Sequence, residues 1–123
     1  MLSHRRTGKG RTVVLQHGFA GGSGYWTPQL AHLGRFFDVI ATDMPGFAGS
    51  GAVPAPETIE GYAAALVGLM NELGVAQFSL VGHSMGGMVA QQVALDHGER
   101  IEKLILYGTA GSGNLPNRFE TFE

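Results

Sequence analysis

A single serine stands between glycines at the junction of two apolar segments. The run Val81–Gly87 reads VGHSMGG; the apolar stretch Gln77–Val81 leads into it, and the helical pattern Met88–Leu95 follows it. This is G-x-S-x-G in the context of strand, sharp turn and helix. Glycines have no Cβ, so the backbone can turn tightly and leave the Ser84 hydroxyl exposed. The pattern predicts a nucleophilic serine at a helix start, where free N–H groups face a developing oxyanion.

Two further glycine-rich segments follow apolar strands. Thr12–Gln16 ends in His17–Gly22, which reads HGFAGG, and a later strand leads into Asp43–Ser50, which reads DMPGFAGS. In this order, the three motifs resemble those of the α/β-hydrolase family. The resemblance covers about residues 10–110, and the chain departs from it at Ala48, where a glycine often stands.

The resemblance implies roles for individual residues. Ser84 would be the nucleophile, and the backbone N–H groups of Phe19 and Met85 would form an oxyanion hole. Residues expected to support these loops are His17, Gly18, Asp43, Gly82, His83 and Gly86. From the residues themselves, several methionines and aromatic residues could line an apolar substrate pocket: Met44, Met85, Met88, Phe19, Tyr25, Trp26 and Phe47. Trp26 and Phe47 are the candidates selected from this set.

Strands and helices alternate along the chain. Expected strands cover Leu2–Arg6, Thr12–Gln16, Asp38–Thr42, Gln77–Val81 and Lys103–Tyr107; expected helices cover Pro28–Leu33, Thr58–Leu73 and a segment from the serine to Gly98. Continuous apolar strands are typical of a parallel sheet that is covered on both faces. The alternation implies right-handed βαβ units. We therefore expect a single α/β domain over residues 1–123, with a mostly parallel sheet and helices on both faces.

Composition excludes several classes of function. Hydrophobic residues make up 44% and charged residues 15% of the 123 residues, which indicates a globular chain. The net charge of −2 and the single short basic cluster, His4–Arg11, argue against a nucleic-acid partner; the cluster is interpreted as a solvated strand end. No apolar run approaches the ~20 residues of a membrane span. There is no cysteine, no histidine pair with zinc spacing and no phosphate-loop pattern in Gly18–Gly24. We expect a cytoplasmic protein without metal or cofactor.

No histidine is well placed as the base that a serine nucleophile needs. His97 follows Ser84 by about a helix length, which puts it ~20 Å away at the wrong end of the sheet. His83 and His17 are better explained as parts of the two loops, although His17 is the more serious alternative as a base. Asp43 is expected to hydrogen-bond the turn that follows it. By resemblance, residues 111–123 would begin a cap region, and the acid and base would lie beyond Glu123.

The expected function is hydrolysis of a small carboxylic ester or lactone through a serine ester. Carbon–carbon bond hydrolysis and cofactor-free perhydrolysis would use the same residues, and a non-catalytic binding domain stays open because no base is visible. The last strand, Lys103–Tyr107, is apolar and would form an open sheet edge. We expect association through this edge with a second copy or with a missing half of the fold.

Overall fold

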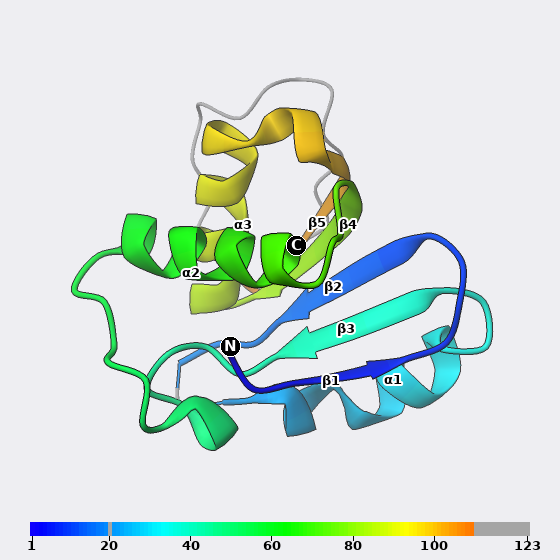
Figure 1. Cartoon of the computed structure of the whole chain (residues 1–123), viewed down its shortest axis with the longest axis horizontal. Helices are drawn as coiled ribbons and strands as arrows, with labels where there is room; N and C mark the ends of the chain where they lie inside the picture. Colours follow the sequence, from blue (N-terminus) through cyan, green and yellow to red (C-terminus); the bar gives the residue numbers. More distant parts are fainter. Residues whose placement is uncertain (20, 110–123) are drawn as a thin grey trace.

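Five strands form one mixed sheet in the computed structural model, which describes residues 1–19 and 21–109 (Figure 1). Within this part of the chain, the strands are β1 (His4–Thr7), β2 (Thr12–Gln16), β3 (Asp38–Thr42), β4 (Phe78–His83) and β5 (Ile101–Tyr107). Their spatial order is β1-β3-β2-β4-β5, and only β1 runs antiparallel to its neighbour. The expected α/β class with a mostly parallel sheet is confirmed. Residues 111–123, the expected start of a cap, lie outside the described part.

Helices cover both faces of this sheet (Figure 1). The described α-helices are α1 (Thr27–Leu33), α2 (Ile59–Glu72) and α3 (Met85–Asp96), and short 3-10 turns are η1 (Ser23–Trp26), η2 (Ala48–Ser50) and η3 (Gly98–Arg100). Thr58 caps α2, because its hydroxyl accepts a hydrogen bond from the N–H of Gly61. The helix after the serine ends at Asp96 rather than at Gly98, since the chain enters η3 there.

Two apolar clusters fill the two faces. The larger cluster joins α2 and α3 to the sheet, with Phe78, Leu80 and Val93 fully buried. The smaller cluster joins α1 to the opposite face and includes Leu15 and Trp26. The alternation of side chains along each strand separates the clusters, as expected for a sheet that is buried on both sides.

The loops that carry the three motifs meet at one edge of the sheet. Gln16, the last residue of β2, lies opposite Gly82 of β4, and Leu15 of β2 lies opposite Ala41 of β3. The arrowheads of β2 and β3 point to the same side of the molecule in Figure 1. Because parallel strands bring their carboxyl ends to one edge, the segments that follow these strands become neighbours there.

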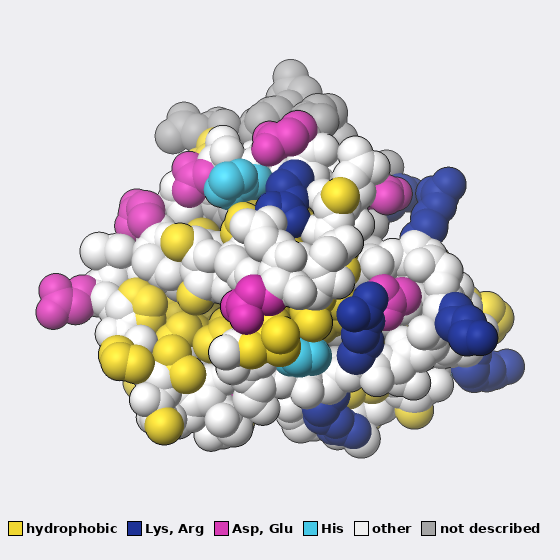
Figure 2. Space-filling model, viewed as in Figure 1, with side chains coloured by type: hydrophobic (Ala, Val, Ile, Leu, Met, Phe, Trp, Pro, Cys, Tyr) yellow, Lys and Arg dark blue, Asp and Glu magenta, His cyan; other side chains and the backbone are white. Residues whose placement is uncertain are grey.

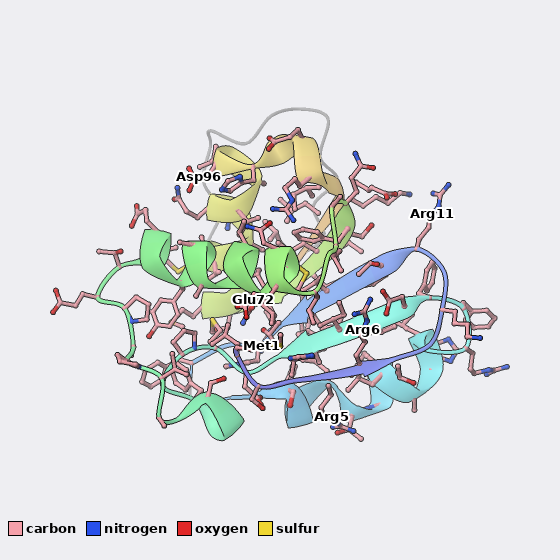
Figure 3. All side chains as sticks on the ribbon, viewed as in Figure 1. Met1, Arg5, Arg6, Arg11, Glu72 and Asp96 are labelled. Carbon is pink, nitrogen blue, oxygen red and sulfur yellow. The ribbon has the colours of Figure 1, made fainter. Side chains whose placement is uncertain are left out.

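An ion pair between Arg6 and Asp38 joins the N-terminal strand β1 to the sheet. It spans His4–Thr7, slightly later than expected, and its Arg5 and Arg6 project to opposite sides (Figure 3). Arg6 donates to both carboxylate oxygens of Asp38 at 2.9 and 3.0 Å. The hydrogen bond from Arg6 is the main reason that the pKa of Asp38 lies below its usual value. The basic cluster is therefore more than a solvated strand end, because Arg6 joins β1 to the start of β3.

An apolar groove of about 310 Å³ lies on the α1 side of the sheet. Val13, Val81 and Ile105 line it from three neighbouring strands, and Leu33 and Phe37 line it from the region of α1. Four polar or charged residues also line it: Arg11, Ser79, Glu102 and Lys103. Among the described residues, β5 pairs with β4 alone, and α1 borders the groove through Leu33. Exposed apolar surface of this kind favours association.

We predict that the chain self-associates through this groove and the adjoining edge of β5. Ile105→Lys places a charge among apolar side chains and should shift the chain toward monomer, as measured by sedimentation at micromolar concentration. Leu95→Lys is the control, since Leu95 is 43% exposed on α3, against the other face. A wild-type chain that sediments as a monomer at every concentration would contradict this prediction.

Candidate active site

Ser84 has an unusual backbone conformation at the junction of β4 and α3. Its φ is 55° and its ψ is −123°, and its side chain is exposed. Such a conformation costs about 1–3 kcal/mol in a non-glycine residue and persists only where its surroundings enforce it. The N–H of Ser84 donates to the carbonyl of Tyr107, and its own carbonyl accepts hydrogen bonds from the N–H of Gly87 and the hydroxyl of Thr109. These bonds hold the turn, so the serine hydroxyl stands clear of the backbone.

The glycines beside the serine are required by close packing rather than by positive φ. A Cβ on Gly82 would lie 2.5 Å from the carbonyl oxygen of Gly86. A Cβ on Gly86 would overlap the carbonyl oxygens of Gln16 and His17. The first turn of α3 therefore lies directly against the ends of β2 and β4. The positive φ of this turn falls on Ser84 itself.

The segment after β2 approaches the serine from the other side. A Cβ on Gly18 would lie 3.0 Å from Cβ and 3.5 Å from Oγ of Ser84. Gly18, Phe19 and Ser84 line one cleft of about 270 Å³. None of the described residues accepts a hydrogen bond from the N–H of Phe19 or from that of Met85, which begins α3. Gly18 and Ser84 are in close contact, and the residue after each of them, Phe19 or Met85, has a backbone N–H without an acceptor among the described residues.

His17 is fully buried and fixes the start of this segment. Its Nε2 accepts a hydrogen bond of 2.9 Å from the N–H of Met44. The proton of the neutral ring is therefore on Nδ1, which donates to the carbonyl of Gly18 at 2.7 Å. Burial lowers the pKa of His17, although the bond to Gly18 and the charge of Asp43 oppose the shift. With both nitrogens occupied, His17 holds the loop and has no free position to accept a proton from serine.

Asp43 joins three segments from a buried position. One carboxylate oxygen accepts from the N–H of Ser23 at 2.6 Å, and the other accepts from the hydroxyl of Ser3 at 2.8 Å. Burial alone would raise the pKa of Asp43, but these bonds and one from the backbone of Gly49 outweigh it and lower the pKa. Asp43 thus holds the far end of the loop after β2 as well as its own turn.

Three aromatic rings stand in a column beside the serine. The ring of His83 is parallel to that of Tyr25, with centroids 5.0 Å apart and an angle of 2°, and it packs against Tyr107 at 4.4 Å. Its Nδ1 donates to the carbonyl of Tyr107 at 3.1 Å. Interaction with Tyr107 is the main reason that the pKa of Tyr25 lies above its usual value. Tyr25 and His83 line the same cleft as Ser84.

Trp26 and Phe47, the two aromatic residues expected to line a pocket, lie in different surroundings in the structure. Trp26 is 3% exposed and packs among the apolar residues under α1, and it is not among the residues that line the cleft at Ser84. Its neighbour Tyr25 lines the cleft instead. The sequence contained a clue to this difference: Tyr25 and Trp26 are adjacent aromatic residues at a helix start, where only one of two adjacent side chains can face the core. Phe47 is half-buried and meets the rings of Phe19 and His17 edge to face, each at 5.6 Å.

No base for Ser84 is found in the described part of the chain. None of its residues hydrogen-bonds the serine hydroxyl, and His97 lies at the opposite end of α3, where its ring is 3.9 Å from Glu99. Nor do the described residues place three or more potential metal ligands together. A search of the same residues for a helix long and apolar enough to cross a membrane finds none.

Comparison with known proteins gives consistent matches. The family model described as "alpha/beta hydrolase fold" matches residues 11–122. The chain is 38% identical over 119 residues to 2-hydroxy-6-oxo-6-phenylhexa-2,4-dienoate hydrolase of Comamonas testosteroni, covering 92% of this chain and 41% of that protein. Among solved structures, a thermophilic esterase from Thermogutta terrifontis matches with a TM-score of 0.85 and 38% identity, over 94% of this chain and 43% of its own. The enol-lactonase from Burkholderia xenovorans matches with a TM-score of 0.81 and 32% identity, over 89% and 44%. The chain thus spans less than half the length of these relatives.

Gly86→Ala should destabilise the fold strongly. The added methyl group overlaps backbone carbonyl oxygens of β2, which cannot move aside without disturbing the sheet, so we expect a loss of about 2–3 kcal/mol. Gly68→Ala is the matched control within α2, since its Cβ would meet no atom within 4 Å; it should be neutral or stabilise by up to ~1 kcal/mol. Urea denaturation of both variants measures the difference. Equal midpoints would show that the close packing at Gly86 is not required.

His17 should make stability depend on pH in the mildly acidic range. Its folded-state pKa is lowered, so below ~6.5 the unfolded chain binds a proton that the folded chain does not, and stability falls as pH decreases. The slope is at most about 1.4 kcal/mol per pH unit, and it ends once pH reaches the folded-state pKa. His17→Gln should flatten this slope, whereas His32→Gln, an exposed site on α1, should leave it. An unchanged slope in the His17 variant would contradict the assignment.

Proposed function

The chain belongs to the alpha/beta hydrolase fold family, and we propose that it carries the nucleophile side of a serine hydrolase for small carboxylic esters or lactones. The observation that carries the proposal is the exposed Ser84 hydroxyl on a positive-φ residue at the start of α3. Strained conformations of this kind cluster at functional sites because the strain must be maintained by surrounding contacts. Here those contacts come from Gly18, Gly82 and Gly86.

The two unpaired backbone donors support the same proposal. The N–H groups of Phe19 and Met85 would stabilise the oxyanion that forms when a carbonyl carbon is attacked. In another serine hydrolase, removal of one such donor costs about 3–4 kcal/mol of transition-state stabilisation. The N-terminus of α3 adds its positive dipole end at the same place.

The chemistry requires one group that the described residues do not provide. Oγ of Ser84 forms a bond to the carbonyl carbon, and its proton passes to a base. The bond from that carbon to the alkoxy oxygen then breaks, and the base returns the proton to the leaving oxygen. Water repeats the sequence on the serine ester and releases the acid. We propose that the base, and the acid that orients it, come from a segment outside the described residues.

Esters and lactones are the substrates that the observations support best. The relatives at 32–38% identity include an esterase and an enol-lactonase. The cleft of about 270 Å³ is small. In Figure 2, hydrophobic side chains gather beside α2, over the segment that joins β3 to this helix, while most visible Lys and Arg side chains lie toward the other side. This segment begins at Asp43 and adjoins the cleft through Phe47, which favours a substrate with an apolar portion.

Three other functions are compatible with the same residues, and two of them have a specific observation behind them. The Comamonas relative is named as the hydrolase of a hydroxy-oxo-dienoate, and hydrolysis of a carbon–carbon bond in a vinylogous keto acid would use the same serine and donors. Cofactor-free perhydrolysis would use them as well. A non-catalytic binding domain is the third reading, because no described residue serves as base. The reactivity of the Ser84 hydroxyl toward an acylating reagent distinguishes the binding domain from the three catalytic functions.

We predict that this chain alone turns over p-nitrophenyl acetate only slightly, since a serine without its base retains a residual acceleration of about 10³–10⁴ over water. Added imidazole supplies an external base and should accelerate acetylation of Ser84 in proportion to its concentration. The acetylated peptide is identified by mass spectrometry, and Ser84→Ala is the control for reaction elsewhere. Full turnover without imidazole would reveal a base in the chain. No modification at Ser84 under any condition would favour the binding-domain reading.

A further inference from the structure

The proposed oxyanion donors lie on two separate segments of the chain. Phe19 belongs to the loop after β2, whereas Met85 follows the serine at the start of α3. The spacing between the two N–H groups therefore depends on contacts that join these segments. Near the serine, Gly18 provides such a contact. Farther along the loop, Asp43 holds Ser23 to the turn after β3, but that turn is not part of the serine segment.

The ring of Tyr25 provides a further contact between the two segments, in addition to the close approach of Gly86 to Gln16 and His17. Tyr25 lies in η1, two residues after Ser23, and its N–H donates to the carbonyl of Gly22 at 3.1 Å. Its ring lies flat against His83, the residue directly before Ser84. On the other side of His83, the ring of Tyr107 packs at a centroid distance of 4.4 Å and completes the column. The His83 ring is therefore clamped between the loop segment and the end of β5.

The backbone around this clamp leaves little freedom to His83. A Cβ on Gly108, which has a φ of +58°, would lie 3.3 Å from Cε1 of the His83 ring. The ring is also fixed through its Nδ1, which donates to the carbonyl of Tyr107. That same carbonyl accepts the N–H of Ser84. A movement of the Tyr25 ring would thus be passed to His83 and from there to the serine turn.

We propose that Tyr25 is a positioning residue that sets the spacing between the Phe19 and Met85 N–H groups by stacking on His83. This inference rests on the proposed function, because it gives those N–H groups their role. The tyrosine is 46% exposed, so its contribution to overall stability is small compared with that of a core aromatic residue. Its effect should fall on the limiting rate of acylation, since a misplacement of about 1 Å can reduce a rate about 100-fold.

The test compares Tyr25→Phe with Tyr25→Leu in the full 123-residue chain. Phenylalanine keeps the ring stack and loses only the hydroxyl group, whereas leucine loses both. The reaction of Ser84 with a fluorophosphonate gives a limiting rate and an apparent affinity for each variant, and amide resonances of Phe19 and Met85 report the local geometry. Phe36→Leu is the control, since Phe36 is an exposed aromatic residue after α1 that does not line the cleft.

We expect Tyr25→Leu to lower the limiting rate about 10- to 100-fold with little change in apparent affinity, and to shift the two amide resonances. Tyr25→Phe should retain the rate within about threefold, because phenylalanine keeps the aromatic ring that stacks on His83. A loss confined to apparent affinity would make Tyr25 a substrate contact and overturn the inference. Unmoved amide resonances in the leucine variant would overturn it as well, and this readout remains decisive even if wild-type Ser84 fails to react and the proposed function falls.

Discussion

The close approach of three backbone segments determines the rest of the site. The end of β2, the end of β4 and the first turn of α3 meet without a Cβ between them at Gly82 and Gly86. Because this contact fixes where α3 begins, it forces Ser84 into a conformation with φ of 55°. The same contact places the segment after β2 against the serine, since Gly18 leaves no room for a side chain. The edge of the sheet thereby carries a cleft with an exposed hydroxyl, and the N–H groups of Phe19 and Met85 beside it have no acceptor among the described residues.

Buried polar groups outside the cleft keep this arrangement in place. His17 joins Gly18 to Met44 through both ring nitrogens, and Asp43 joins Ser23 to the N-terminal segment. Each group is hydrogen-bonded at both of its polar atoms, so its burial does not leave an uncompensated donor or acceptor. From the sequence, both residues were expected to hold loops, with His17 as the alternative base, and the hydrogen bonds occupy both nitrogens of its ring.

The sequence predicted the elements and the serine turn because these depend on local patterns. Continuous apolar runs marked the parallel strands, and glycines around Ser84 marked the turn, with boundaries that differ by a few residues. Contacts between side chains that are far apart in the sequence could not be predicted in the same way. Whether Trp26 or Tyr25 faces the cleft depends on how η1 sits on the sheet, and the pairing of Arg6 with Asp38 depends on an antiparallel strand neighbour. The role of His17 required the position of Met44, which no spacing in the sequence gives.

The central claim is that the serine turn and the loop after β2 together form a site that stabilises a developing oxyanion. A crystal structure of the fluorophosphonate adduct tests it most directly. We expect a phosphorus atom bonded to Oγ of Ser84, with its phosphoryl oxygen about 2.7–3.1 Å from the backbone nitrogens of both Phe19 and Met85. A phosphoryl oxygen that points to solvent, away from both nitrogens, would contradict it.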